Sequence, residues 1–422
     1  MSVSALLALR ILRQSHVRGA AMAIGLAMVP LIVLSIVADG MIEGITSRYI
    51  ELKTYHARAY LAESADAESA LRDIRAVPGV SGAFLEIGGQ GLLRSPHAQT
   101  AVLLRCVDPA LGSDPGFKRY LSILAGAFDL EASGSALLGE KTAARLGVGV
   151  GDELQLATLV SLGRNALPRL GRVRVTGIFS TGYQELDKNW VFLSVRDGAR
   201  ILSSGRRERF VGVKLEHPFA ERAGTLKALR AALPSSARVY DWYQLELNQF
   251  RSFEVTRNLL RFIMALVVLV GCINVSSAVF MVVLERQQDI GILKSMGASP
   301  GDVRRIFFLV GLFTGIAGSG GGMALGLLLG VHVNELFSVV EAAVNALAAG
   351  LQWAQKPAGA QTTIAPLRIL GSGYYLERIP VNLRLPELAL IAACTIALAA
   401  AAAWLPARRA GRLRPLEVIR KH

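Results

Sequence analysis

The chain has 422 residues, of which 52% are hydrophobic and only 18% are charged, and its mean hydropathy is +0.42. A soluble domain carries roughly 25% charged residues, so this composition argues against a purely soluble protein. Three cysteines are too few for a disulfide framework, and the net charge of +14 raises the question of a nucleic-acid partner.

Four apolar runs are long enough to cross a bilayer, which takes about 20 residues. They cover residues 20–38, 262–284, 306–331 and 388–405. We expect all four to be helical, because lipid offers the backbone no hydrogen-bond partner. The first run could instead be a cleavable signal peptide, but its 19 residues exceed the usual signal core and favour an uncleaved anchor.

The basic residues indicate the orientation of these spans. Residues 1–19, 285–305 and 406–422 hold 13 basic and 4 acidic residues, which supplies nine of the 14 net positive charges. If the spans alternate, all three stretches lie on one side of the membrane, which we interpret as cytoplasmic. No basic stretch carries the interleaved aromatic residues of a nucleic-acid site, so we expect no nucleic-acid partner.

Residues 39–261 separate the first two spans and predict a folded domain outside the membrane. Its ends, 44–61 and 243–261, have helical patterns and are expected to be stalks that continue the spans. Between them, helical and strand patterns alternate, which indicates an α+β domain. The expected helices are 67–76 and 226–232, and the expected strands are 101–107, 172–179 and 190–195.

The link 285–305 predicts a short amphipathic helix, a turn and the start of the third span. Gly297 suits a helix end, and Ser299 with Asp302 forms a box-like helix start. Apolar residues recur at about helical spacing at Ile290, Ile292, Leu293 and Met296. Two interpretations stay open, because such a helix can lie on the lipid surface or dock in a cytoplasmic partner.

The third span carries a glycine at every fourth position, which permits close helix packing. The stripe consists of Gly318, Gly322, Gly326 and Gly330. It can pack within the chain or against a second subunit. A further helix is expected at 334–351 and a loop at 355–372. No charged residue occurs within the four spans, which argues against an ion path.

No motif in the sequence supports catalysis. The six histidines make no metal-ligand spacing. The stretch 134–142 looks like a phosphate-binding loop, but Glu140 stands between its glycine and Lys141 and would repel phosphate. We therefore expect no cofactor and no metal in this chain.

Several segments resemble ABC transporter permeases of the MacB/FtsX/LolC type. They are the coupling segment 285–299, the tail 405–420, Pro78-Gly79-Val80, Val107-Asp108-Pro109 and Gly151-Asp152. The lipoprotein-releasing permeases LolC and LolE look most similar, through 175–193, Asp241-Trp242 and Asn274–Ser277. Two features depart from that pattern: Asp39-Gly40-Met41 replaces the usual Asn-Gly-Phe, and the loop 352–373 is longer.

The resemblance implies a membrane α-helical fold with four transmembrane helices and an α+β periplasmic domain on helical stalks. It places the chain in the bacterial inner membrane as a multi-pass protein with both termini cytoplasmic. The implied segments are 1–38 (N-terminus and first span), 39–261 (periplasmic domain with stalks), 262–284 (second span), 285–305 (cytoplasmic coupling helix), 306–331 (third span), 332–387 (second periplasmic segment), 388–405 (fourth span) and 406–422 (cytoplasmic tail).

The resemblance also implies a function. The chain would be a non-catalytic permease subunit that extracts lipoproteins from the outer leaflet and passes them to a periplasmic chaperone by mechanotransmission. The implied partners are two ABC ATPase subunits that bind ATP and Mg²⁺, a second permease copy or paralogue, the chaperone, the lipoprotein substrate and membrane lipids. Two other classes stay open: a MacB-like efflux permease of a tripartite pump and an FtsX-like signalling protein.

Site residues follow from the same resemblance. The ATPase-coupling residues would be Glu285, Arg286, Asp289, Ile290, Gly291, Ile292, Leu293, Lys294, Met296 and Gly297. The chaperone hook would be a hairpin at 159–170 with Leu159, Val160, Leu162, Leu167 and Pro168. An ordinary, partly buried hairpin is the alternative there, and a LolE-like chain would contact the lipoprotein instead. Met41 and Ile42 would line the lipoprotein path.

Overall fold

The computed structural model describes the chain except residues 1–7, 9–10, 12–14, 163–164, 204–206, 218–221, 356–378, 382 and 413–422. The described chain forms two compact units. The first, which we call the helical unit, contains the described parts of Met1–Met41, Phe253–Ala360 and Ile379–His422. The second, the α/β unit, contains the described part of Ile42–Ser252.

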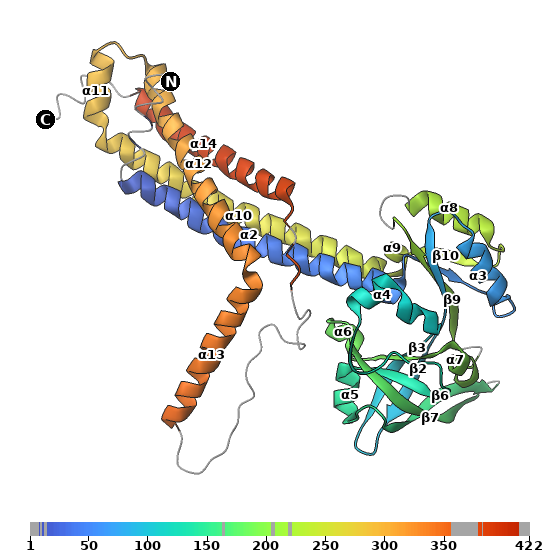
Figure 1. The fold of residues 1–422 in the computed structure, drawn as a ribbon. Helices are drawn as coiled ribbons and strands as arrows, with labels where there is room; N and C mark the ends of the chain where they lie inside the picture. The colour runs from blue at the N-terminus through green and yellow to red at the C-terminus, as the bar shows by residue number, and fades with distance from the viewer. Residues whose placement is uncertain are drawn as a thin grey trace. The chain divides into compact units, whose positions relative to one another are not determined.

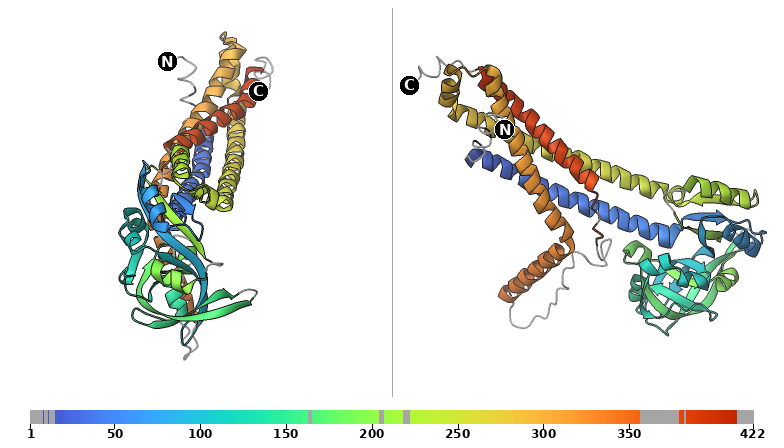
Figure 2. Two further views of the ribbon diagram at one scale, coloured as in Figure 1. Left: turned by 90° about the vertical axis from the view of Figure 1, so that its right-hand side faces the viewer. Right: turned by 45° about the horizontal axis from the view of Figure 1, so that its top comes forward.

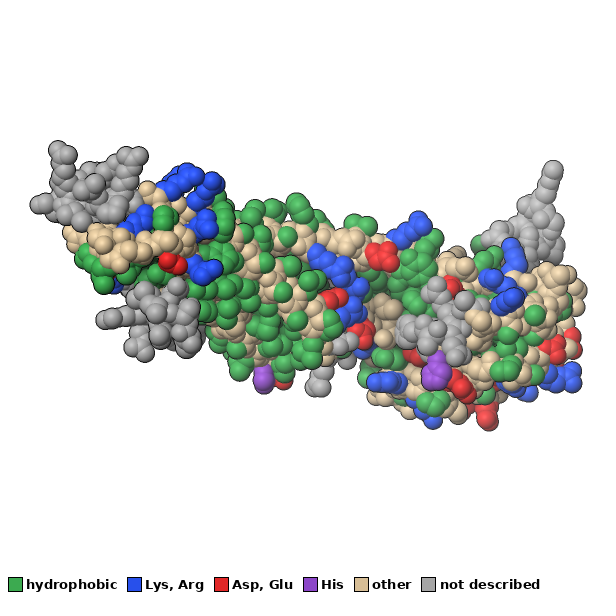
Figure 3. Space-filling view, turned by 90° about the horizontal axis from the view of Figure 1, so that it is seen from above, with side chains coloured by type: hydrophobic (Ala, Val, Ile, Leu, Met, Phe, Trp, Pro, Cys, Tyr) green, Lys and Arg blue, Asp and Glu red, His purple; other side chains and the backbone are tan. Residues whose placement is uncertain are grey.

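Four helices among the described residues are long and apolar enough to cross a membrane (Figure 1). They are α2 (Ser15–Arg48), α10 (Leu247–Glu285), α12 (Pro300–Val331) and α14 (Leu385–Arg412). Each contains one of the four apolar runs, so the expectation of four spans is confirmed. Apolar side chains cover the helical unit between charged groups that gather toward its ends (Figure 3).

Two shorter helices complete the helical unit, α11 (Gln287–Ser295) and α13 (Val333–Gln355). Gly297 follows α11 with a φ of +96°, which a residue with a side chain rarely adopts. Ser299 and Asp302 then form a reciprocal capping box at the start of α12, with Pro300 in its first turn. The predicted helix, turn and span start are therefore present.

The glycine stripe of α12 packs against α2 of the same chain. A Cβ atom at Gly322 would lie 2.7 Å from the carbonyl oxygen of Gly25, and Gly318, Gly326 and Gly330 approach α2 as closely. Of the two interpretations of the stripe, the structure shows packing within the chain. Elsewhere on α12, Gly311 faces α14 in the same way.

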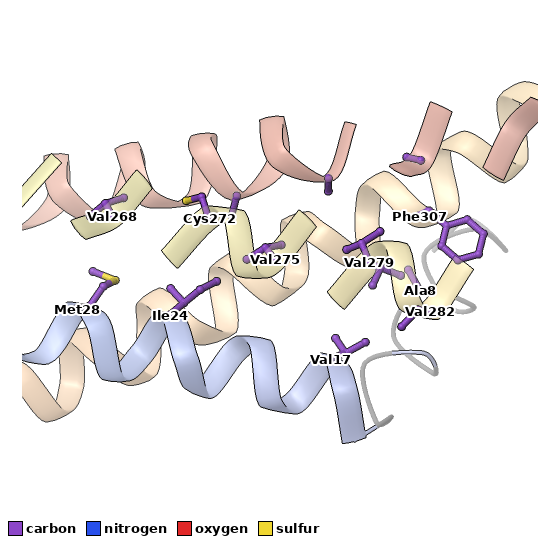
Figure 4. Close-up of a cluster of buried hydrophobic side chains, with 14 of the residues drawn as sticks. Ala8, Val17, Ile24, Met28, Val268, Cys272, Val275, Val279, Val282 and Phe307 are labelled. Carbon is purple, nitrogen blue, oxygen red and sulfur yellow. The ribbon is translucent and has the colours of Figure 1, made fainter. Parts of the chain in front are cut away.

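The second of the four long helices, α10, packs on α2 through a buried apolar cluster. Ile24 and Met28 of α2 lie close to Cys272 and Val275 of α10 (Figure 4). Because lipid is as apolar as these side chains, their packing and not their removal from water holds the helices together.

Replacement of Gly322 by Leu tests this packing. The new side chain would collide with the backbone of α2, and we expect a loss of about 1–3 kcal/mol in stability. The matched control is Gly320→Leu, since a Cβ atom at Gly320 meets nothing within 4 Å. The two full-length variants are compared by thermal unfolding in the same detergent. Equal unfolding midpoints would contradict this packing of α12 on α2.

The first lobe of the α/β unit is an antiparallel sheet with strand order β10-β1-β9-β2. Its strands are β1 (Ala57–Tyr60), β2 (Val80–Arg94), β9 (Glu208–Leu215) and β10 (Arg238–Asp241). The helices α3 (Ala67–Arg75) and α8 (Arg222–Ala232) join its strand pairs. Buried Ile74 and Leu229 from these helices pack on the sheet at Val211. This is a split βαβ lobe of the ferredoxin-like kind.

The second lobe is a closed barrel of six strands, which shares β2 with the first lobe (Figure 2). The other five are β3 (Gln99–Val107), β5 (Ser135–Gly139), β6 (Glu153–Leu162), β7 (Asn165–Ser180) and β8 (Trp190–Ser194). β6 closes the barrel by pairing with β2, where Ala157 lies opposite Leu92. Leu104, Leu138 and Leu156 belong to its buried core.

Short elements surround the two lobes. They are η2 (Pro109–Ser113), α4 (Pro115–Tyr120), β4 (Ser122–Gly126), α5 (Glu140–Leu146), α6 (Gln184–Asp187), α7 (Val195–Ile201) and α9 (Trp242–Leu245). All five expected elements of the middle region occur with shifted ends, and the fold is mixed α/β as expected.

The first stalk is shorter than predicted. The helix expected over 44–61 ends in a π-helical turn, η1 (Tyr49–Thr54), and the chain then enters β1. Tyr55 has a φ of +56°, which breaks the helix. Pairing of β1 with β9 and β10 outweighs the local helical pattern. The expected loop 355–372 lies, apart from its first residue, outside the described residues.

Candidate functional site

The coupling residues predicted from the sequence lie on α11 and beside it. Ile290 is buried in the core of the helical unit, and Leu293 is half-buried. Ile292 and Met296 are 55% and 80% exposed and lie one helical turn apart. The outward apolar face of α11 is therefore formed by Ile292 and Met296.

α11 is also tied to its own chain by polar contacts. The Lys294 amine donates a hydrogen bond of 2.7 Å to the carbonyl of Gly411, which lies at the end of α14. Arg286 and Asp289 form an exposed ion pair of 2.5 Å, and Glu285, Gly291 and Gly297 complete the predicted set, with Gly291 buried. A displacement of α11 would thus act directly on α14.

The predicted hook lies in the β6–β7 hairpin of the barrel. Leu159 pairs with Pro168 and Val160 with Leu167, so Leu159 and Leu167 lie on opposite faces. Both are exposed, as is Pro168, and Leu170, which was not among the named hook residues, is 70% exposed. The side chains of Val160 and Leu162 lie outside the described residues. The hairpin therefore exposes apolar groups on both faces.

Met41 and Ile42, the predicted path residues, are half-buried on α2. Met41 is the last residue of its segment in the helical unit, and Ile42 is the first of the α/β unit. Their role in a lipoprotein path stays a prediction.

Sequence reasoning missed a group of buried and half-buried polar side chains around η1 in the α/β unit. We call Glu51, His56, Asp114 and Lys214 the anchor cluster. The backbone N–H of Leu215 donates to Nδ1 of His56 at 2.7 Å, so the proton of the neutral ring is on Nε2, which donates to Glu51 at 3.1 Å. The Lys214 amine contacts the other oxygen of Glu51 and lies 3.7 Å from Asp114.

A buried ion pair between Arg105 and Glu86 lies beside the anchor cluster. Arg105 donates two hydrogen bonds of 2.7 Å to the carboxylate of Glu86, and the Tyr55 hydroxyl donates a third at 2.6 Å. Arg105 also donates to the carbonyl of Leu52 in η1. Burial alone would raise the pKa of Glu86, but the Arg105 guanidinium outweighs it and holds that pKa below its ordinary value. The pair thus stays charged and holds η1.

Contacts from η1 and the end of α2 reach several further parts of the α/β unit. Arg48 donates to the carbonyl of Thr181 at 2.8 Å, and Lys53 pairs with Glu246 at 2.6 Å. The sequence does carry a signal for these contacts, because charged residues occur within 44–61, which was expected to be a plain helical stalk. These contacts hold η1 and the end of α2 against several other segments of the α/β unit.

Metal ligation has no support in the described part of the chain, where no group of three or more His, Cys, Asp or Glu side chains could hold an ion. The stretch that resembles a phosphate-binding loop forms regular secondary structure: residues 135–139 form β5, and Glu140 begins α5. The absence of a cofactor stays a prediction.

The described chain thus combines long apolar helices with a two-lobed α/β unit. Residues 20–231 match the family described as MacB-like periplasmic core domain, and residues 261–415 match FtsX-like permease C-terminal. The chain belongs to this permease family. It is a transmembrane permease of the FtsX-like and MacB-like type, as the resemblance in the sequence indicated.

Three curated relatives are similar to this permease over much of its length. The lipoprotein-releasing system transmembrane protein LolC of Xylella fastidiosa (strain Temecula1) is 27% identical over 81% of this chain and 78% of its own. LolC of Neisseria meningitidis serogroup B is 25% identical over 94% and 92%. LolE of Haemophilus influenzae is 27% identical over 69% and 66%. The similarity extends to both kinds of lipoprotein-releasing permease.

Replacement of Glu86 by Gln tests the buried pair. The change leaves the Arg105 charge without its partner in the interior, and we expect the α/β unit to lose about 3–5 kcal/mol of stability. Glu208→Gln is the control, because Glu208 is exposed on β9 of the same unit. Thermal unfolding of the full-length permease, followed by tryptophan fluorescence, measures both, and an unchanged transition in the Glu86 variant would contradict the role of the pair.

Proposed function

We propose that this permease is a subunit of an ABC complex that extracts lipoproteins from the outer leaflet of the inner membrane and passes them to a periplasmic chaperone. The observation that carries the proposal is the similarity to LolC of Neisseria meningitidis over 94% of this chain. Separate ATPase subunits, two per complex, bind ATP and Mg²⁺, and a second permease copy or paralogue completes the complex. Both termini then lie in the cytoplasm and the α/β unit in the periplasm.

The energetics explain why such a complex needs a motor. Transfer of a lipid anchor to water costs about 0.8 kcal/mol per CH₂ group, so several acyl chains cost on the order of tens of kcal/mol. A sheltered apolar path reduces that cost, and ATP hydrolysis by the partner subunits supplies the rest. This permease would contribute the path and the mechanical link.

The contacts of α11 and η1 support mechanotransmission. A partner that moves Ile292 and Met296 also moves α14, because Lys294 binds the end of that helix. Within the α/β unit, Lys214 of β9 and Arg105 of β3 hold η1 against the strands. Force that reaches η1 would therefore act on these strands.

The docking part of the proposal is tested by Ile292→Asp and Met296→Asp. A charge on the exposed face of α11 should reduce the amount of ATPase that co-purifies with the permease on the order of tenfold, which corresponds to about 1.4 kcal/mol. The control is Ile292→Leu with Met296→Leu, which keeps both exposed side chains apolar and should retain the ATPase. Full recovery of the ATPase with both test variants would remove α11 as its docking site.

The exposed hairpin favours a LolC-like contact with the chaperone over a LolE-like contact with the lipoprotein. Exposed apolar groups on a projecting element often mark a binding site. Leu159→Asp and Leu170→Asp should reduce capture of the purified chaperone on the order of tenfold without a loss of bound ATPase.

Gln155→Asp is the matched control for the hairpin, because Gln155 is exposed on the same strand. Capture that is unchanged by both leucine variants would favour the LolE-like role. Cross-linking to an adaptor and an outer-membrane duct would favour the MacB-like pump.

A further inference from the structure

The helix α13 stands apart from the packed core of the helical unit. It begins at Val333, directly after His332, which forms the bend that ends α12 at Val331. Figures 1 and 2 show that α13 turns away from α12 and runs across the direction of α2 and α10. Among the described residues, none of α13 belongs to the buried apolar cluster of this unit. Most of its described side chains are exposed or half-buried.

The two sides of α13 differ in chemistry. One side is apolar, and its residues recur at every third or fourth position, as on one side of a helix. They are Leu336, Val340, Val344 and Leu347, with exposed fractions between 38% and 67%. The other side carries polar residues, namely Asn334, Ser338, Glu341 and Asn345. α13 is thus an amphipathic helix with an exposed apolar side.

Asn334 fixes the direction in which the polar side faces. Its side-chain amide donates to the carbonyl of Ile379 at 3.0 Å, and its side-chain oxygen accepts from the backbone N–H of Ile379 at 3.1 Å. Ile379 lies outside the fourth span, because α14 begins only at Leu385. The polar side of α13 is therefore turned toward chain outside the spans, and the apolar side is turned away from it.

The position of α13 on the chain favours lipid as the cover of its apolar side. The apolar run of α12 continues to its last residue, Val331, where Leu328 and Val331 are both exposed. α13 therefore begins at the boundary of the membrane that α12 crosses. A helix that runs across the spans at this boundary lies along the membrane surface, where an amphipathic helix buries its apolar side among the upper acyl chains.

The composition of α13 fits a helix that lies on the membrane. It is not among the four helices that are long and apolar enough to cross. It contains two glutamates and no lysine or arginine, so attraction to anionic headgroups cannot hold it. Apolar contact with the acyl chains is then the source of binding.

We propose that α13 lies in the membrane surface on the side opposite α11, with Leu336, Val340, Val344 and Leu347 among the acyl chains. α11 precedes α12 and α13 follows it, so a span separates the two helices. In the orientation of the proposed function, this surface is the outer leaflet of the inner membrane. The inference rests on α12 crossing the membrane and does not depend on the cargo that the permease moves.

Nitroxide labels on the full-length permease in phosphatidylcholine nanodiscs test this position. Cys394 is first replaced by Ala, because it is exposed, whereas the other two cysteines are buried. The test variants are Val340→Cys and Leu347→Cys, and the matched controls are Ser338→Cys and Ala342→Cys, at exposed positions on the opposite side. Collision rates with oxygen, which enters lipid, and with a water-soluble nickel chelate give the depth of each label.

We expect the labels at 340 and 347 to lie about 5–10 Å below the headgroups and the two control labels to lie in water. The same depths are expected in phosphatidylglycerol, because α13 has no basic residue. A second pair of variants moves the helix itself. Val340→Asp with Leu347→Asp should bring a label at Val344 into water, since buried charges are costly in lipid. Ser338→Asp with Ala342→Asp should leave that label at depth.

Three results would overturn the proposal. If neither reagent reaches the labels on the apolar side, protein covers it, from another part of this chain or from a second copy. Equal access of the nickel chelate to both sides would show that α13 stands in water. Insertion in phosphatidylglycerol but not in phosphatidylcholine would show that lipid charge, and not apolar contact, holds the helix.

Discussion

Arg105 and Glu86 form an ion pair in the α/β unit, where both side chains are almost completely buried. A buried ion pair is stable only if its remaining donors and acceptors are also satisfied. Tyr55 supplies one further contact and the carbonyl of Leu52 another, and both belong to the chain segment that leaves the first helix. The position of η1 is therefore set by the need to keep two charges paired.

The helical unit depends on a different constraint. Apolar helices gain no hydrophobic free energy by associating in lipid, so their association depends on surfaces that pack closely. Glycines on α12 provide such surfaces toward α2 and α14. Polar contacts also link these helices: Lys294 binds Gly411 near the end of α14. Arg257 and Arg261 of α10 pair with Asp39 of α2 and Glu387 of α14.

The contacts at α11 and those at η1 are chemically different. At α11, the contacts are exposed apolar side chains and one hydrogen bond, which a partner can reach. At η1, they are buried charges, which cannot be lost one at a time without leaving another unpaired. The first suits the reversible contact that we propose for α11, and the second suits a permanent attachment.

The sequence by itself determined what depends on neighbouring residues. The four spans follow from apolar runs, and the capping box at Ser299 and the end of α11 at Gly297 follow from local hydrogen bonding. Only the tertiary structure decided that Ile290 points into the core while Ile292 does not, that the stripe packs on α2, and that 57–60 is a strand. The closed barrel and the pairing of Glu51 with Lys214 join residues far apart in the chain. Periodicity shows that a face is apolar, but which surface covers it depends on contacts that no local pattern specifies.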